Sequence, residues 1–185
     1  EEGNESYRSY DGVLCDAKDM SVVYCPCARK GRVTIADGIE RVAYGAFEGC
    51  TNLTEVVLPL SVKTIGVYAF SGCSRLEKVI LPEGLREIGV GAFDGCVKLF
   101  ETTKRYDGFY VLNGWAVDPW GVGVVEHGGL GGRLALPDGV RGVADRTFAK
   151  REIPNFATNE TRTVQAALFV SLPRSLRHIG RYAFC

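Results

Sequence analysis

The chain has few of the residues on which catalysis and metal binding most often depend. Its 185 residues include two histidines, two tryptophans and one methionine. The longest runs without a charged residue, 64–74 and 163–173, are 11 residues long, and an apolar helix needs roughly 18 to cross a bilayer. Lys plus Arg equals Asp plus Glu at 22 each, so no net charge attracts nucleic acid or an anionic membrane. We therefore expect no membrane insertion of this segment and no nucleic-acid partner.

The motifs of the common enzyme classes are also missing. The sequence has no Gly-x-Ser-x-Gly, His-Glu-x-x-His or Gly-x-x-x-x-Gly-Lys-Ser/Thr pattern, and these would indicate a hydrolase, a zinc protease or a phosphate-binding loop. His127 lies in a glycine-rich stretch, and His178 lies on a predicted outward row. A carboxylate pair at glycosidase spacing is compatible with the sequence, but nothing favours it. We predict no enzyme activity, no cofactor and no metal.

The strongest feature present is a repeat with a period of 23 residues. The unit reads Leu-x-x-Val-x-Leu-Pro, then five residues, then Ile-Gly-x-x-Ala-Phe-x-Gly-Cys. Two later, incomplete copies keep the offsets between the proline, the aliphatic residue and the phenylalanine. The residues on this step are Phe47, Phe70 and Phe93 and the cysteines Cys50, Cys73 and Cys96, and the later copies carry Phe148 and Phe184 at the phenylalanine position, so these residues are expected to form a structural ladder. Such a period indicates stacked coils, because one short unit cannot bury its own apolar face.

Each unit predicts two short strands and a tight turn. Residues 53–58 and 76–81 are rich in leucine and β-branched residues, which favour strands, and a proline ends each run. A second extended piece, such as 85–88, alternates apolar and charged residues. The Ala-Phe-x-Gly-Cys segment then reads as a turn or a single helical turn. The fold class predicted is a β-rich α/β solenoid with an internal ladder of phenylalanines.

The repeat unit resembles the BspA-like leucine-rich repeat of bacterial and some protozoan surface proteins. The match is specific over residues 33–99 and weaker over 133–185. The resemblance implies a right-handed stack of leucine-rich-repeat coils with inserted or capping β-hairpins. It also implies a role in adhesion to host or matrix proteins and an extracellular or cell-surface location.

Two segments outside the period resemble each other and divide the chain. Tyr10-Asp11-Gly12-Val13-Leu14 corresponds to Tyr106-Asp107-Gly108-Phe109-Tyr110. We predict a single solenoid over 1–185 with four parts: a hairpin cap (1–32), regular repeats (33–99), an inserted hairpin (100–132) and degenerate repeats that end in mid-repeat (133–185). The hairpin turns are expected at 16–19 and 117–121. The extra residues around 153–159 are expected to form a polar loop.

The cysteines are interpreted as structural. A row along one face of a solenoid does not converge on a tetrahedral metal site, whereas small apolar thiols suit a tight turn. Cys25-Pro26-Cys27 with Cys15 is a weaker alternative for metal binding, and a Cys15–Cys25 disulfide is a further alternative. Seven cysteines cannot all pair within one chain.

Three surfaces are candidates for binding. One outward row of the second strands carries the cations Lys63, Arg86, Arg141 and Arg177, with Glu40 at one end. These cations can attract acidic protein segments or sulfated glycans. The alternative is that the row is ordinary solvated surface. A cluster of aromatic residues either contacts a ligand or forms the core of the second hairpin: Tyr106, Phe109, Tyr110, Trp115 and Trp120. The third is an apolar outward row on the main strands: Thr34, Val57, Ile80, Ala135 and Ser171.

The leading function is therefore non-catalytic binding of a protein or glycan outside the cell. The alternative is a structural spacer or display module of a larger surface protein, and a glycan-binding or glycan-active domain ranks third. A contiguous exposed aromatic or basic patch would favour binding, and buried aromatic residues with evenly interspersed charges would favour the spacer.

Overall fold

The chain is described by a computed structural model that covers residues 4–106, 109–117, 133–148, 151–155, 160–164 and 169–184. The chain divides into two compact units, and the described part of the first is residues 4–104. The first unit contains β1 (Tyr7–Tyr10), β2 (Val13–Asp16), β3 (Ser21–Tyr24), β4 (Gly31–Thr34), β5 (Arg41–Val42), β6 (Leu53–Val57), β7 (Thr64–Ile65), β8 (Lys78–Ile80), β9 (Glu87–Ile88) and α1 (Val97–Glu101). Among the described residues, no helix is both long and apolar enough to span a membrane.

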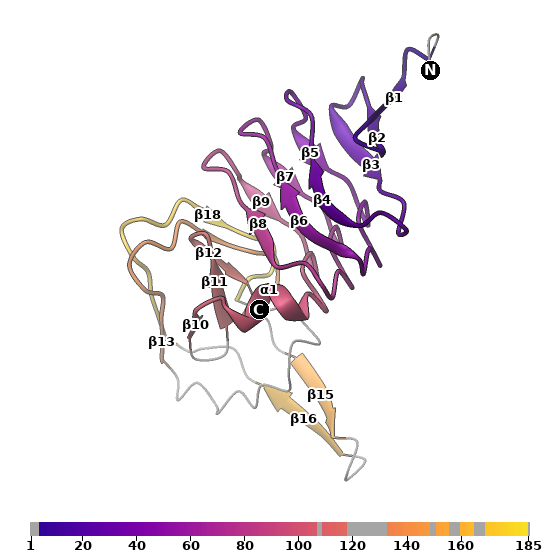
Figure 1. Cartoon of the computed structure of the whole chain (residues 1–185). Coiled ribbons are helices and arrows are strands. Elements are labelled where there is room, and N and C mark those ends of the chain that lie inside the picture. The colour runs from indigo at the N-terminus through magenta and orange to yellow at the C-terminus, as the bar shows by residue number, and fades with distance from the viewer. Residues whose placement is uncertain are drawn as a thin grey trace. The chain divides into compact units, whose positions relative to one another are not determined.

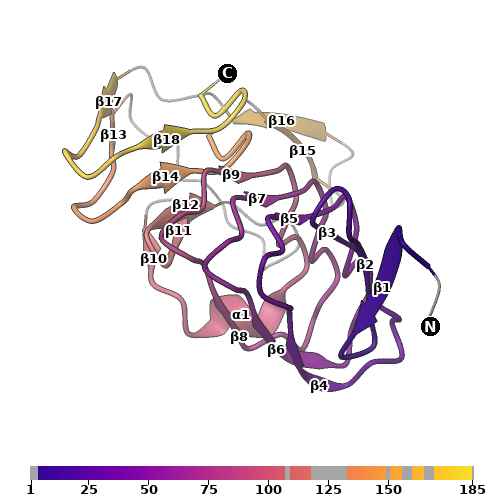
Figure 2. The same ribbon diagram turned by 90° about the horizontal axis from the view of Figure 1, so that it is seen from above.

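The first unit is built from coils that each contribute one strand to two parallel sheets. Strands β4, β6 and β8 form one sheet, and β5, β7 and β9 lie together in the other; Figure 2 shows the two sets on opposite sides of the unit. Partner residues in neighbouring strands are 23 apart, as in Val56 with Val79 and Ile65 with Ile88. The period therefore equals one coil, and the predicted β-solenoid fold is confirmed (Figure 1).

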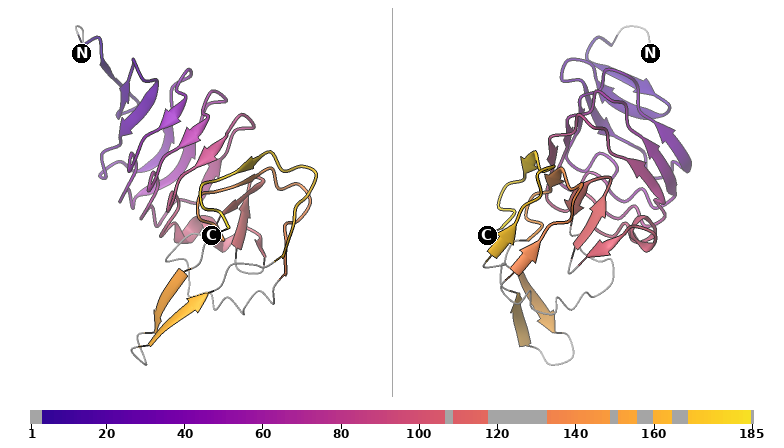
Figure 3. Two further views of the ribbon diagram at one scale, coloured as in Figure 1. Left: turned by 180° about the vertical axis from the view of Figure 1, so that it is seen from behind. Right: turned by 90° about the vertical axis from the view of Figure 1, so that its left-hand side faces the viewer.

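An antiparallel meander precedes the coils. Strands β1, β2 and β3 pair in order, and β3 then pairs in parallel with β5. Asp11 and Gly12, which join β1 to β2, both have positive φ, the conformation of the tight hairpin turns that match strand twist. The link between β2 and β3 occupies residues 17–20. The meander thus extends the second sheet to six strands, as the left view of Figure 3 shows.

The core of the first unit is a column of stacked aromatic rings lined by valine, leucine and isoleucine. The ring centroids of Phe47 and Phe70 are 4.9 Å apart, and those of Phe70 and Phe93 are 5.4 Å apart, with nearly parallel planes. The thiols of Cys73 and Cys96 each donate a hydrogen bond of 3.1 Å to a backbone carbonyl of the preceding coil, at Phe47 and Phe70. The same two carbonyls accept the N–H groups of Cys50 and Cys73 within their own turns, so each buried thiol adds a hydrogen bond that joins neighbouring coils.

The second unit repeats this plan on a smaller scale. Its strands are β10 (Arg105–Tyr106), β11 (Phe109–Leu112), β12 (Trp115–Val117), β13 (Arg133–Ala135), β14 (Gly142–Val143), β15 (Arg151–Asn155), β16 (Glu160–Val164), β17 (Phe169–Ser171) and β18 (His178–Ile179). An antiparallel meander, β10-β11-β12, continues into the parallel strands β14 and β18, and β13 pairs in parallel with β17. Rings of Phe109, Phe148 and Phe184 pack in the core.

Two sequence predictions about the second unit were wrong. The hairpin between β11 and β12 turns at Asn113-Gly114, where both residues have positive φ, and not at 117–121. Asn-Gly is the usual signal for such a turn, so the sequence contained the correct position. Residues 153–155 of the polar loop expected around 153–159 belong to β15, which pairs antiparallel with β16, and residues 156–159 lie outside the described residues.

Candidate functional site

The outer face of the β4-β6-β8 sheet presents an apolar row beside a charged row. We call this surface the sheet face and define it by Arg32, Thr34, Glu55, Val57, Lys78 and Ile80. Strand register aligns Thr34 with Val57 and Val57 with Ile80, and Ile80 is 56% exposed. Single exposed apolar residues are ordinary, whereas an aligned row on one sheet forms a continuous surface.

The charged row is held by ion pairs. Glu55 lies between Arg32 and Lys78, with contacts of 3.9 Å to the guanidinium and 3.0 Å to the ammonium. The hydrogen bond from Lys78 holds the pKa of Glu55 below its ordinary value, against the effect of desolvation. The two cations are more exposed than the carboxylate between them. The row therefore presents a net positive edge beside the apolar row.

The predicted cation stripe is divided between the two units. In the first unit, Lys63 N–H donates to the Glu40 carbonyl and Arg86 N–H donates to the Lys63 carbonyl, both at 2.8 Å. The Lys63 ammonium also pairs with the Glu40 carboxylate at 2.5 Å, which neutralises part of the row. In the second unit, the Arg177 N–H donates to the Arg141 carbonyl at 2.8 Å.

The predicted aromatic cluster is mostly core. Phe109 and Trp115 are each 1% exposed, and Tyr110 is also buried. Tyr106 stacks on Phe109 with ring centroids 5.5 Å apart. Of the two alternatives for this cluster, burial supports the hairpin core for Phe109, Tyr110 and Trp115 and does not support their role as candidate binding residues. Trp120 lies outside the described residues, as does His127.

His178 provides a further reason why the cluster is core. Its ring stacks on Trp115 with centroids 5.9 Å apart and an interplanar angle of 2°. Trp115 lies in β12, and His178 lies in β18, with β14 between them in the sheet. His178 was expected on a solvated row, but its ring covers the tryptophan.

An exposed pair of tyrosines was not predicted. Tyr44 is 68% exposed, and its ring meets that of Tyr68 edge to face with centroids 6.0 Å apart. Tyr68 has a φ of 55°, at a repeat position where Gly45 and Gly91 have φ of 56° and 63°. Its ring occupies the space that a Cβ on Gly91 would need. These two tyrosines do not follow the 23-residue period, so the repeat does not indicate them.

Two further cysteines lie beside the outer end of the cysteine column. The strand register shifts by one residue between Gly31 and Arg32, so the Cys25 carbonyl accepts the Cys50 thiol as the Phe47 carbonyl accepts that of Cys73. By the same shift, Cys27 lies beside Gly49. The Cys27 thiol is exposed, whereas the thiols of Cys15, Cys25 and the column members are buried, and all six are unpaired by disulfides. The Cys15–Cys25 bridge is therefore absent. In the part of the chain described here, no group of three or more His, Cys, Asp or Glu residues can hold a metal ion.

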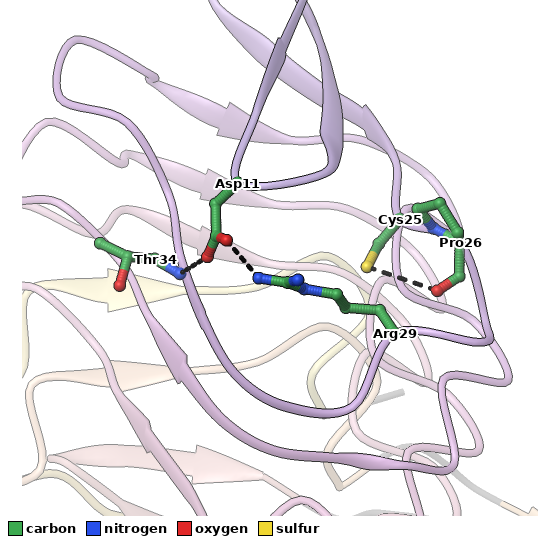
Figure 4. A network of polar contacts seen from close by, with 5 residues as sticks. All are labelled: Asp11, Cys25, Pro26, Arg29 and Thr34. Atoms are coloured by element: carbon green, nitrogen blue, oxygen red, sulfur yellow. Dashed lines mark hydrogen bonds and ion pairs between the residues drawn. The ribbon is translucent and has the colours of Figure 1, made fainter.

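A polar contact fastens the N-terminal meander to the first coil. Asp11, in the β1–β2 turn, forms an ion pair with Arg29 and accepts a hydrogen bond of 3.2 Å from the Thr34 N–H (Figure 4). These contacts hold the pKa of the Asp11 carboxyl below its ordinary value, first through the Thr34 N–H and then through Arg29. The carboxylate thus links β1–β2 to the end of β4.

This contact predicts a specific acid response. Because the folded-state pKa of Asp11 is lowered, its contribution is complete above the ordinary aspartate pKa of about 3.9 and is lost as pH falls through the lowered value. We expect the Thr34 amide resonance to titrate with a midpoint below that ordinary value in a nuclear magnetic resonance pH series. Arg29→Ala should raise this midpoint, and Asp11→Asn should abolish the transition. A midpoint at or above the ordinary value would contradict the assignment.

Comparison with known proteins identifies the repeat. Residues 22–106 match the BspA type leucine rich repeat region, in six copies. This part of the chain is a BspA-type leucine-rich repeat. Its family resemblance, predicted from the Leu-x-x-Val-x-Leu-Pro and Ala-Phe-x-Gly-Cys patterns, is confirmed. No curated protein matches the chain.

Solved structures show the same BspA-type architecture. A leucine rich cell surface protein of Faecalibacterium prausnitzii aligns with a TM-score of 0.52 and 20% identity over 96% of this chain and 40% of that protein. The pneumococcal vaccine antigen PcpA aligns with a TM-score of 0.50 and 18% identity over 100% of this chain and 39% of the antigen. The chain thus spans about two fifths of the length of each. These likenesses establish the fold, and leucine-rich-repeat proteins of this kind are generally non-catalytic.

Proposed function

We propose that this chain is a non-catalytic, protein-binding segment of a cell-surface protein and that the sheet face is its binding surface. The observation that carries the proposal is the aligned row of Thr34, Val57 and Ile80 beside the ion-paired row. Related BspA-type proteins are surface proteins, which supports an extracellular or cell-surface location. Repeat stacks commonly use such extended faces to bind partners.

The chemistry of the face favours a protein with apolar and acidic side chains. Ile80 and Val57 present aliphatic surface that a partner can remove from water. The exposed cations Arg32 and Lys78 lie one row away, where they complement carboxylates that flank an apolar side chain. Sugars are usually held by stacked aromatic rings, and none of the six residues that define the face is aromatic. This composition favours protein over glycan as the partner.

The test is direct binding to immobilised extracellular proteins. Collagen, laminin and fibronectin serve as protein probes, and heparin serves as the glycan probe. We expect the chain to bind at least one protein probe and the double variant Val57→Asp, Ile80→Asp to bind it about tenfold more weakly or worse, because each aliphatic side chain contributes roughly 1.5–3 kcal/mol when fully buried. Lys78→Glu should also weaken binding.

Leu60→Asp is the matched control. Leu60 is 83% exposed but follows β6 in a loop, so the same apolar-to-acidic change there should leave binding unaltered. Binding that both variants retain equally would overturn the sheet face as the site. Binding to heparin alone would replace the protein partner by a glycan. Failure to bind any probe would favour the spacer function.

A further inference from the structure

Two cysteines lie beside the outer end of the cysteine column, and one of them is exposed. Cys27 is exposed, and Cys25 and Cys50 are buried. The Cys50 thiol lies close enough to Cys25 and Cys27 for each to shift its pKa, Cys25 upward and Cys27 downward. It also lies 3.5 Å from the Cys25 carbonyl, and the Cys27 thiol lies 3.4 Å from the Glu48 carbonyl. Three thiols thus meet where the outermost of them reaches solvent.

The positions of Cys27 and Cys50 suit a disulfide. The strand register shifts by one residue between Gly31 and Arg32, so Cys27 lies across from Gly49, the residue before Cys50. The Cys27 sulfur lies 3.9 Å from the position of a Cβ on Gly49 and 3.4 Å from the Glu48 carbonyl. Neighbouring coils are separated by about 4.7–4.9 Å, the spacing of paired strands. Disulfides form between residues whose Cα atoms are about 4.4–6.8 Å apart. Cys73 and Cys96 also lie in neighbouring coils, but their thiols are buried and donate to backbone carbonyls. Among the described thiols, Cys27 alone is exposed to solvent and also has a second thiol beside it.

We propose that Cys27 is a thiol-modification site, at which a low-molecular-weight disulfide forms a mixed disulfide that Cys50 resolves into a Cys27–Cys50 disulfide. In the first step the Cys27 thiolate attacks one sulfur of the reagent, its S–S bond breaks, and one thiolate leaves and takes up a proton. In the second step Cys50 attacks the Cys27 sulfur and expels the other thiolate. The two protein thiols are oxidised, and the reagent disulfide is reduced to two thiols.

Burial and the neighbouring Cys50 raise the pKa of the Cys27 thiol, and contact with Cys25 and burial raise the pKa of Cys50. Both thiols attack as thiolates, so both steps should become faster as pH rises.

The test uses the reduced chain and oxidised glutathione, followed by intact mass and peptide mapping. All proteins carry Cys185→Ser, so that the thiol of the last residue does not contribute. We expect a transient single glutathione adduct on Cys27, followed by a protein lighter than the reduced form by two hydrogen atoms. Trypsin should then release peptides 19–29 and 42–63 joined by a disulfide. Fragmentation between Cys25 and Cys27 assigns the bond.

Three variants separate the roles of the thiols. Cys27→Ser should abolish both the adduct and the disulfide, and because Cys27 is exposed, the variant should fold normally. Cys25→Ser should form both the adduct and the Cys27–Cys50 disulfide as the parent chain does, because Cys25 is not the resolving thiol. Cys73→Ser, one coil further in, is the control and should behave as the parent chain. An adduct that persists on the parent chain, or a bond mapped to Cys25, would overturn the proposal.

Discussion

Phe70→Ala should lower the free energy of unfolding by about 3–5 kcal/mol, the usual range for removing a buried phenylalanine ring. Phe70 is fully buried and has a ring stacked on each side, at 4.9 Å from Phe47 and 5.4 Å from Phe93. Its removal leaves a void between two rings whose turns are held in place by backbone hydrogen bonds between coils, such as Phe47 N–H to the Ala69 carbonyl at 2.8 Å, so neighbours cannot close it. Urea unfolding followed by circular dichroism measures the change, with the unfolding slope checked for two-state behaviour.

The control for this variant is an exposed aromatic residue of the same unit. Tyr44→Ala removes a ring of similar size that is 68% exposed and touches Tyr68 edge to face. Its loss should cost less than about 1 kcal/mol. If Phe70→Ala were as mild as Tyr44→Ala, the ring column would not be the main element of the core.

Gly89→Ala should be similarly destabilising, by about 3 kcal/mol, at the upper end of the range for overpacking. A Cβ on Gly89 would lie 2.6 Å from the Val67 nitrogen and 2.8 Å from the Gly66 carbonyl carbon, both backbone atoms of the preceding coil. The Gly89 N–H also donates to the Ile65 carbonyl at 2.8 Å, so the strand cannot move away without losing a bond. Glycine is needed here for space, because its φ is one that any residue adopts.

Gly84→Ala is the matched control for Gly89→Ala. A Cβ on Gly84 would lie 3.5 Å from the Leu60 carbonyl oxygen, an ordinary contact, and its φ is also unrestricted. This variant should be neutral or more stable by roughly 0.4–1 kcal/mol, because alanine restricts the unfolded chain. Thermal unfolding of both variants tests the pair. If both variants changed the stability equally, contact between a Cβ on Gly89 and the preceding coil would not be the reason that this position needs glycine.

The repeat predicted the inward residues of the first unit well for a physical reason. Parallel pairing in register makes equivalent positions adjacent, so any residue on the 23-residue step that is apolar in one coil packs on its copy in the next. Phe47, Phe70 and Phe93 are the clearest example. The first coil departs from this rule, because its register shifts by one residue between Gly31 and Arg32. Cys25, which is 22 residues before Phe47, therefore takes the place that Phe47 has in the next coil.

The residues outside the period were harder to place. The burial of Trp115 depends on β14 and on His178 of β18, which lies 63 residues further along the chain, and no local pattern contains that contact. The left-handed φ of Tyr68 likewise depends on the absence of a side chain at Gly91. An aromatic cluster in sequence therefore predicted an important site but could not distinguish core from surface.

The register of the parallel strands also governs how such a gene can change in length. Val56 pairs with Val79, and Ile65 with Ile88, each one period apart. Inserting one residue within a strand would turn every following side chain to the opposite face. Inserting or deleting a whole 23-residue unit leaves every inward position inward and replaces one stacking contact by an equivalent one. Duplication and loss of complete coils are thus the length changes that this architecture accommodates, so related chains can differ greatly in size while each neighbouring pair of coils stays the same.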